Sequence, residues 1–348
     1  MAKNIIALFG GQGLTEEGMA SGLLDDAPDN KVFRDVSRDL FARIQNVARR
    51  EGYQVPTVEE IAGMQVSEQA RPSFTHLVAY PVNVAAFQAF MDLASMEGAK
   101  PNLIAASGQS LGMYSALTVA GALPFDSASQ VVLQRGLKQD DWAQLLRKVN
   151  PEYYLESADF DMYALIGIDD ITAEEVAQQT GVYVTGVNCE GMVNVAGEHS
   201  LMARTIDLAK ARGARKAVQL QVGAPFHSYL MRGSAKSFSD YLRENRIGEI
   251  VASSGISIIS DVDGKAISPG DFARRAGSHI EEKVKFVDAI RNIGNIAAKS
   301  DSALVAFGNP AAVRAVKGWV SSTLGKTYPI HGVSDRASAY STLEQLAA

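Results

Sequence analysis

Short runs of hydrophobic residues that stop at glycine-rich turns mark two buried strands. The run Ile5 to Phe9 is followed by Gly10-Gly11-Gln12-Gly13, and the run Leu103 to Ser107 is followed by the pentapeptide 108–112. Apolar runs of this length, bounded by glycine, are typical of strands buried in a parallel sheet. We therefore predict that both segments lie in the core of an α/β fold.

Helical patterns accompany these strands. Residues 31–52 are polar along one side, which predicts an amphipathic helix. Residues 76–91 are largely apolar and rich in helix formers, so they predict a long helix with Pro81 near its first turn or at a kink. Residues 113–117 directly follow the second glycine turn and predict a further helix.

The middle of the chain predicts a second, smaller unit. Strand candidates at 163–168, 182–188, 192–196 and 216–222 alternate with helix candidates at 172–179 and 201–212. Thr172 and Glu175 have the spacing of a capping box at the start of the first helix. The order β-α-β-β-α-β is that of a ferredoxin-like unit. We expect a large α/β-hydrolase-like domain with a parallel sheet, residues 1–160 and 224–348, into which a small ferredoxin-like α+β subdomain, residues 161–223, is inserted.

Length, composition and charge fit such an arrangement. The 348 residues exceed the usual size of one compact domain, and 47% hydrophobic with 21% charged residues is enough for a sizeable core. The net charge of −6 argues against nucleic acid as a partner, because phosphate binding needs a basic surface. Arg212, Arg215 and Lys216 form a local basic cluster that either docks an acidic carrier protein or is a solvated helix end.

Cysteine content and hydropathy exclude several other classes. Cys189 is the single cysteine, which excludes an internal disulfide and a cysteine-rich zinc site. The apolar run 5–9 is too short for a secretory signal, and no apolar stretch reaches the ~18–20 residues of a membrane span. We therefore expect a cytoplasmic protein that does not enter a membrane.

Ser110 is the leading candidate for a nucleophile. It is the central residue of Gly108-Gln109-Ser110-Leu111-Gly112, a G-x-S-x-G sequence between a predicted strand and a predicted helix. A sharp turn there lifts the serine Oγ out of the sheet and aims the N–H of Leu111 at a reacting carbonyl oxygen, beside the positive end of the helix. The motif alone leaves open a glycine-rich helix start without catalysis.

A serine nucleophile needs a base, for which the chain offers five histidines. His227 lies in Ala224-Pro225-Phe226-His227-Ser228, after a predicted strand and before a helix, where loops tend to display catalytic groups. We therefore favour His227 as the base. The histidines interpreted as surface or structural residues are His76, His199, His279 and His331.

Six blocks along the chain extend the similarity beyond this motif. They are Phe9 to Gly13, Gly108 to Leu117, Gln134 to Gly136, Asn188 with Val195 to Gly197, Pro225 to Ser228, and Ser260 to Gly264. They resemble, in order, the F-P-G-Q-G, G-H-S-L-G-E-Y-S-A-L, R-G, N…V-I-S-G, histidine and S-N-V-D-G blocks of the malonyl-CoA:acyl carrier protein transacylase family, which includes the acyltransferase domains of polyketide synthases. Their order and spacing match from residue 4 to 340, so the resemblance covers nearly the whole chain.

The resemblance implies a reaction through an acyl-enzyme. Ser110 would attack the thioester of an acyl-CoA, and His227 would act as general base and then as general acid in each half-reaction. The family uses this dyad without an aspartate, and a backbone carbonyl from a later Q-x-x-x-P-V block orients the histidine. That block corresponds to residues 279–284, so His279 would supply the carbonyl.

The resemblance also implies how substrate is held. The backbone N–H groups of Gln12 and Leu111 would form the oxyanion hole, and Arg135 would clamp the free carboxylate of a malonyl group with its planar fork. Taken alone, Arg135 is also compatible with a charge on a helix surface, but its position relative to Ser110 favours the clamp. Phe226 resembles the bulky residue of malonyl-selective polyketide domains and would crowd a 2-methyl substituent. The expected substrate-binding residues are Arg135, Gln109, Phe226 and Asn188.

Some positions depart from the family pattern. Gln109 replaces the motif histidine, Met113 the motif glutamate, Gly10 a proline, and 306–310 an E-V-G-P-G block. The segment 140–161, with its aromatic residues Trp142, Tyr153 and Tyr154, is longer than in the family, and it either reshapes the acyl pocket or carrier-protein surface or is a surface loop. Neither Gln109 nor Met113 is the nucleophile or the base, so these changes bear on the acyl group rather than on catalysis.

Three functions are compatible with the sequence. The first is transfer of a malonyl group from malonyl-CoA to the phosphopantetheine thiol of an acyl carrier protein, in fatty acid or polyketide synthesis. The second is a trans-acting hydrolase or transacylase for a different acyl group in a polyketide pathway, which would leave the Arg135 cation unpaired. The third is a non-catalytic binding or scaffold protein. None requires a metal or a bound cofactor, since coenzyme A enters as a thioester substrate.

Overall fold

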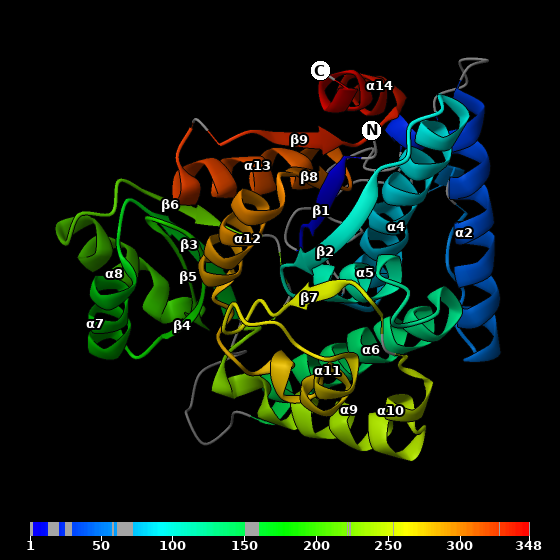
Figure 1. The fold of residues 1–348 in the computed structure, drawn as a ribbon. Helices are drawn as coiled ribbons and strands as arrows, with labels where there is room; N and C mark the ends of the chain where they lie inside the picture. Colours follow the sequence, from blue (N-terminus) through cyan, green and yellow to red (C-terminus); the bar gives the residue numbers. More distant parts are fainter. Residues whose placement is uncertain are drawn as a thin grey trace.

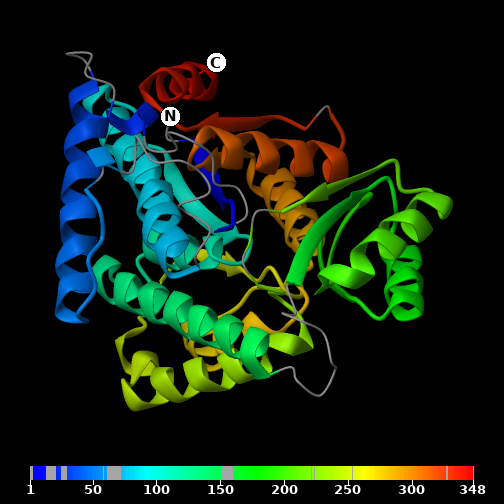
Figure 2. The same ribbon diagram turned by 180° about the vertical axis from the view of Figure 1, so that it is seen from behind.

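Two sheets organise the chain, of which the computed structural model describes residues 3–12, 21–24, 30–57, 59–60, 72–149, 160–220, 222, 224–252, 254–326 and 328–347 (Figures 1 and 2). The strands are β1 (Asn4–Phe9), β2 (Asn102–Gly108), β3 (Phe160–Ile166), β4 (Tyr183–Cys189), β5 (Met192–Glu198), β6 (Lys216–Gln219), β7 (Ser257–Ile259), β8 (Ser302–Phe307) and β9 (Ile330–Val333). The larger sheet is parallel, with the order β7-β2-β1-β8-β9, and the smaller is antiparallel, with the order β4-β5-β3-β6. The predicted fold class is confirmed.

Helices cover both faces of the parallel sheet. The α-helices are α1 (Ser21–Leu24), α2 (Lys31–Arg50), α4 (Pro72–Met96), α5 (Gly112–Val119), α6 (Phe125–Val149), α7 (Asp170–Thr180), α8 (His199–Ala211), α9 (Arg232–Glu244), α10 (Ile247–Ile250), α11 (Pro269–Arg275), α12 (Phe286–Ser300), α13 (Pro310–Leu324) and α14 (Arg336–Ala347). Two short 3-10 helices are η4 (Tyr229–Met231) and η5 (Ser278–Ile280). In Figure 1, α12 and α13 lie between the smaller sheet and the parallel sheet, and α4 and α2 lie on the opposite side of the parallel sheet.

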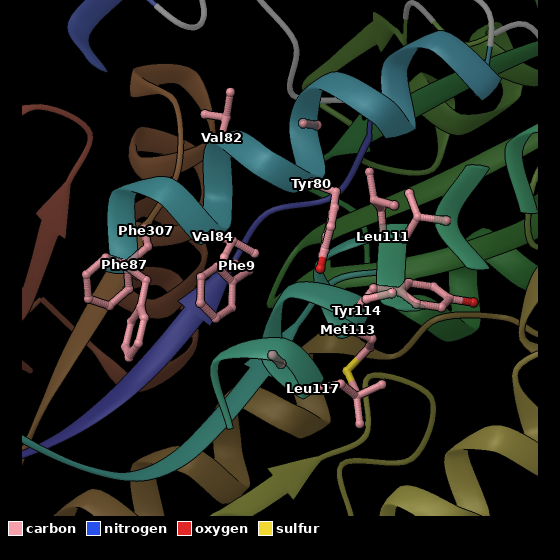
Figure 3. Packing of buried hydrophobic residues seen from close by; sticks show 14 of the residues in the cluster. Phe9, Tyr80, Val82, Val84, Phe87, Leu111, Met113, Tyr114, Leu117 and Phe307 are labelled. Carbon is pink, nitrogen blue, oxygen red and sulfur yellow. The ribbon is translucent and has the colours of Figure 1, made fainter. Parts of the chain in front are cut away.

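The position of strand β1 between two layers of helices explains why the run Ile5 to Phe9 is uniformly apolar. Its odd-numbered residues pack with α4 and α5, and its even-numbered residues pack with α12 and α13. On the α4 side, Phe9 stacks on Phe307 with the ring centroids 5.9 Å apart, and Phe87 meets Phe307 edge-on at 5.2 Å (Figure 3). A strand buried on both faces cannot show the alternating pattern of a half-exposed strand.

Helix α4 is longer than predicted. It begins at Pro72 and ends at Met96, beyond both ends of the predicted 76–91, and Pro81 lies in its interior rather than in its first turn. Within the described part of the chain, α4 is the one helix with the length and hydropathy of a membrane span, and 83% of that window is buried in the fold. Its apolar character therefore reflects a central place in the core.

The smaller sheet and two helices form the unit predicted in the middle of the chain. Its elements run from Phe160 to Gln219, and the antiparallel order β4-β5-β3-β6 is that of a ferredoxin-like unit. Asp169, not Thr172, is the N-cap of α7, because the Asp169 carboxylate accepts the Thr172 N–H at 2.9 Å. The predicted capping box at Thr172 and Glu175 is therefore wrong.

The first half of the long segment 140–161 is helix, not loop. Residues 140–149 complete α6, and the indole N–H of Trp142 donates to the Leu230 carbonyl at 2.7 Å. The Trp142 ring also lies directly against Gly233 of α9. Tyr153 and Tyr154, like Gly13 of the first glycine turn, lie outside the described residues.

Candidate active site

The turn that carries Ser110 is tight and strained. It joins the end of β2 to the start of α5, and Ser110 has φ = +51°, in the left-handed region that non-glycine residues rarely adopt. A Cβ on Gly108 would lie 2.1 Å from the backbone of Gly112, and a Cβ on Gly112 would lie 2.6 Å from the Phe9 carbonyl oxygen. Both motif glycines are therefore required by packing, and the turn presents Ser110 at the carboxyl end of the sheet.

Ser110 and His227 form a hydrogen-bonded pair. The Ser110 Oγ lies 2.7 Å from the His227 Nε2, and the His227 Nδ1 lies 3.1 Å from the Glu282 carbonyl oxygen. Because a carbonyl only accepts, Nδ1 carries the proton and Nε2 presents its lone pair to the serine. The orienting carbonyl belongs to Glu282, so the prediction of His279 for this role is wrong. The carbonyl of Ile280 fixes the same residue by accepting the His227 N–H at 3.0 Å.

The surroundings of His227 keep its ring neutral. Burial is the largest influence, and with the neighbouring His279 and Arg135 it lowers the pKa of His227 to about 3. A neutral imidazole is the form that accepts a proton, so His227 is ready to act as a base at neutral pH.

A buried carboxylate supports the turn from behind. Asp261 accepts the Ser110 backbone N–H at 2.6 Å, and His279 Nε2 lies 3.0 Å from the other carboxylate oxygen. Burial alone would raise the pKa of Asp261, but His279 and the Ser110 N–H together hold it below its usual value. His279 thus acts through its side chain on the Ser110 turn. In the sequence, Asp261 stood only as one position of the block Ser260 to Gly264 that resembles S-N-V-D-G, without a role of its own.

Arg135 is a buried cation beside the nucleophile. It projects from α6 with 1% of its surface exposed, and its Nη2 lies 3.2 Å from the Ser110 Oγ. Its Nη1 lies 3.0 Å from His76 Nε2, while its Nε has no hydrogen-bond partner. Burial lowers the pKa of Arg135, but a guanidinium stays protonated at neutral pH. Its burial excludes the interpretation as a helix-surface charge. No described carboxylate lies within ion-pair distance of it, although the charge of Asp261 raises its pKa and its guanidinium carbon lies 5.7 Å from the centre of the Tyr114 ring.

His76 belongs to the site, although the sequence placed it among structural residues. It is fully buried in α4, and its Nε2 lies 2.7 Å from the Gln12 Oε1 as well as close to Arg135. Burial, followed by the charge of Arg135, lowers its pKa well below the usual value. The isolated histidine in an apolar helix carries no sequence signal of this contact, because its partners lie 59 and 64 residues away.

The residues predicted for the oxyanion hole flank the nucleophile. Gln12 follows β1 and lines the same pocket as Ser110, and Leu111 caps the N-terminus of α5. The loops after β1 and β2 are joined, because the Gln109 N–H donates to the Phe9 carbonyl at 3.0 Å. A helix N-terminus favours negative charge. The assignment of these two N–H groups to an oxyanion hole stays a prediction.

The pocket over Ser110 lies between the large sheet and the smaller unit. It has about 690 Å³ of empty space, part of which is open to solvent. The predicted substrate residues Gln109, Phe226 and Asn188 all line it, and Gln109 Nε2 donates to Asn188 Oδ1 at 2.7 Å. Apolar residues that the sequence did not single out complete the wall, among them Met162, Met192, Leu220, Val284 and Trp319.

A family model and similar proteins both relate this chain to acyltransferases. Residues 7–306 match the model of the acyl transferase domain. The chain is 26% identical over 296 residues to the malonyl CoA-acyl carrier protein transacylase of Bacillus subtilis (strain 168), covering 83% of this chain and 82% of the relative. It is 26% identical over 250 residues to the transacylase of the same name from Staphylococcus aureus (strain MRSA252), covering 70% of each.

Solved structures agree on the fold. An acyl carrier protein of a type II polyketide synthase has been solved in complex with its malonyl-transacylase, which matches with a TM-score of 0.75 at 24% identity, over 98% of this chain and 99% of that one. The FabD structure of Acinetobacter baumannii matches with a TM-score of 0.78 at 20% identity, over 100% and 99%. At these identities the structures establish the arrangement of the sheets and helices.

Proposed function

Because this chain belongs to the acyl transferase domain family, we propose that it transfers a malonyl group from malonyl-CoA to the phosphopantetheine thiol of an acyl carrier protein. The reaction proceeds through an acyl-Ser110 intermediate and serves fatty acid or polyketide synthesis. The relatives named as malonyl CoA-acyl carrier protein transacylases support this substrate pair.

The observation that carries the malonyl assignment is the unpaired cation of Arg135. A buried guanidinium without a carboxylate is costly, and a bound carboxylate would relieve that cost by a charge-assisted pair of hydrogen bonds. Arg135 Nη2 is 3.2 Å from the Ser110 Oγ, so the carboxylate it holds must belong to the acyl group being transferred. A malonyl group has its free carboxylate only one methylene from the reacting carbonyl, which fits this short separation.

The chemistry follows from the contacts at Ser110. His227 Nε2 takes the Oγ proton as Ser110 attacks the thioester carbonyl, and the oxyanion is held by the backbone N–H groups of Gln12 and Leu111. The intermediate collapses to the acyl-serine, and the departing CoA sulfur takes the proton from His227. The carrier thiol then reverses these steps, giving its proton to His227 and regenerating Ser110.

A trans-acting acyl hydrolase or a transacylase for another acyl group is the second candidate. The apolar wall that includes Met162, Met192 and Trp319 favours it, since a nonpolar acyl chain would find contact there. Initial rates for a panel of acyl-CoA and acyl-carrier thioesters, with free acid and transferred acyl groups both measured, separate the two. A preference for malonyl with little free acid excludes the second candidate.

The direct test is labelling with radioactive malonyl-CoA, followed by peptide mapping and chase with a phosphopantetheinylated carrier protein. The proposal predicts label on Ser110 that moves to the carrier. The Ser110→Ala variant, with a melting temperature close to that of the wild type, serves as the control. Equal labelling of this variant would overturn the proposal.

A further inference from the structure

Arg135 makes its inner hydrogen bond to an imidazole instead of a carboxylate. Buried arginines are ordinarily paired with acidic side chains, because an uncompensated charge in the interior is costly. Here the neighbour of Nη1 is His76 Nε2 at 3.0 Å, and the described ion pairs include none to Arg135. The group that holds the arginine therefore does not neutralise it.

The hydrogen bonds of His76 define its protonation state. Its Nδ1 lies 3.3 Å from the Val132 carbonyl oxygen, one turn before Arg135 on α6, so Nδ1 carries the proton. With the ring neutral, Nε2 has only a lone pair, which accepts from Arg135. Protonation of Nε2 would instead point a second positive charge at the guanidinium. Burial and Arg135 both oppose it, and both lower the pKa of His76.

The same Nε2 also meets Gln12, the residue proposed to supply an oxyanion N–H. The Gln12 Oε1 lies 2.7 Å from Nε2. Because Nε2 carries only a lone pair in this tautomer, a hydrogen bond here requires the Gln12 amide to be rotated by 180°, so that its NH₂ group faces Nε2. His76 thus connects the arginine with the loop after β1. Space there is limited: a Cβ on Gly136 would lie 2.5 Å from Ser73 and 3.1 Å from His76 Nδ1, so α4 and α6 are in close contact at this point.

We propose that His76 is a positioning residue that sets selectivity for a carboxylated acyl group, by orienting Arg135 through a neutral acceptor that leaves its positive charge free for the substrate. This inference rests on the proposed function. It adds that selectivity depends on the absence of charge at position 76, not only on the presence of Arg135. An acidic side chain in this position would satisfy the arginine internally and compete with the malonyl carboxylate.

Two variants of similar size separate charge from shape. His76→Gln keeps a neutral acceptor near the position of Nε2, and His76→Glu places a carboxylate there. For each, kcat and KM are measured with malonyl-CoA and with acetyl-CoA, which lacks the carboxylate. We expect the Gln variant to keep a malonyl/acetyl selectivity within about threefold of wild type, and the Glu variant to lose about 10- to 150-fold, the range for a hydrogen bond to a charged group. This loss of selectivity should come from a larger fall in kcat/KM for malonyl-CoA than for acetyl-CoA.

His279→Gln is the matched control, because it changes another buried histidine near the dyad that contacts Asp261 and not Arg135. It should slow both substrates alike and leave selectivity unchanged. His76→Ala provides a second route if the Glu variant does not fold. Without its acceptor, Arg135 loses its orientation, and KM should rise several-fold more for malonyl-CoA than for acetyl-CoA.

The outcomes distinguish the two claims. A wild-type enzyme without preference for malonyl-CoA overturns the proposed function. A wild-type preference that persists in a folded Glu variant, or in the Ala variant, overturns the role of His76 and leaves the proposed function standing. Equal loss of both substrates in all three His76 variants also overturns it, because that pattern indicates a structural role alone.

Discussion

The pocket has a reaction half, which contains Ser110 and His227, and a recognition half, which contains Arg135 and His76. The two halves differ in how many of their polar atoms are hydrogen-bonded within the protein. In the reaction half, the Ser110 Oγ and N–H and both His227 nitrogens have partners at 2.6–3.1 Å within the chain. In the recognition half, Arg135 is buried with an unpartnered Nε and without a carboxylate. The first half is complete without substrate, whereas the second is completed by it.

This difference predicts two kinds of failure. Substitutions in the reaction half should slow the transfer of every acyl group equally, because the dyad acts on a thioester carbonyl that all substrates share. Damage to the recognition half should change the ratio between substrates, because only some of them carry the charge that Arg135 needs.

The largest effect is expected at His227. Replacing it with alanine removes the base that accepts the Ser110 proton, which should lower kcat by about 10²- to 10⁴-fold with malonyl-CoA and acetyl-CoA alike. Single-turnover acylation rates measure this directly. A variant that slows malonyl transfer alone would show that the two halves are not separable.

The next effect is expected at Arg135. Arg135→Ala should lower kcat/KM for malonyl-CoA by roughly 10- to 150-fold, the value of a charged hydrogen bond, with acetyl transfer unchanged or faster. Arg135→Lys keeps the charge but not the planar fork, so it should recover part of the loss. Equal loss for both acyl groups in steady-state assays would contradict a recognition role.

A smaller uniform loss is expected at Asp261. Asp261→Ala leaves the Ser110 N–H without its acceptor, which should cost about 1–3 kcal/mol in the free energy of unfolding and up to about tenfold in kcat. Asp261→Asn retains an oxygen for that N–H and should recover much of both. Urea unfolding and kcat with two acyl-CoAs provide the test, and a change in selectivity would argue against a role confined to the turn.

Acid should weaken both halves together, since each contains a buried neutral histidine. The folded pKa values of His76 and His227 lie below the unfolded value near 6.5, so the unfolded chain binds more protons once the pH falls below about 6.5. Stability present above this pH is then lost as pH falls, by about 1.4 kcal/mol per pH unit for each histidine. Urea titrations from pH 7 to 4 should show a shallower loss for His227→Gln than for wild type. Identical slopes would contradict the assignment.

Sequence patterns predicted the fold correctly where the local preference of a segment for strand or helix agrees with its surroundings in the fold. β1 and β2 are apolar runs that end at glycine, and β1 from Ile5 to Phe9 and the second half of β2 are buried. The limits of α4 were wrong because a helix buried on nearly all sides has no polar face to mark its ends, and its packing tolerates Pro81 in its interior. The cap of α7 was misplaced because Asp169 competes with Thr172 for the same N-terminal position.

The candidate site was predictable to the extent that its residues lie in sequence motifs. Ser110 and Arg135 lie in such blocks, but the carbonyl that orients His227 has no side-chain signature, which explains the choice of His279 over Glu282. His76 and Asp261 act on partners 59 and 151 residues away. Contacts between such distant segments are set by how the sheet and α6 pack, and single-sequence patterns do not encode them.

The most direct measurement is a competition for Ser110. Wild type and Arg135→Ala, each exposed briefly to equal concentrations of malonyl-CoA and acetyl-CoA, are analysed by intact mass and peptide mapping. The reaction half should acylate Ser110 in both proteins, with malonyl dominant in the wild type and acetyl dominant in the variant. The same adduct ratio in both, or modification at another residue, would contradict the account of a complete dyad beside a cation that awaits its substrate.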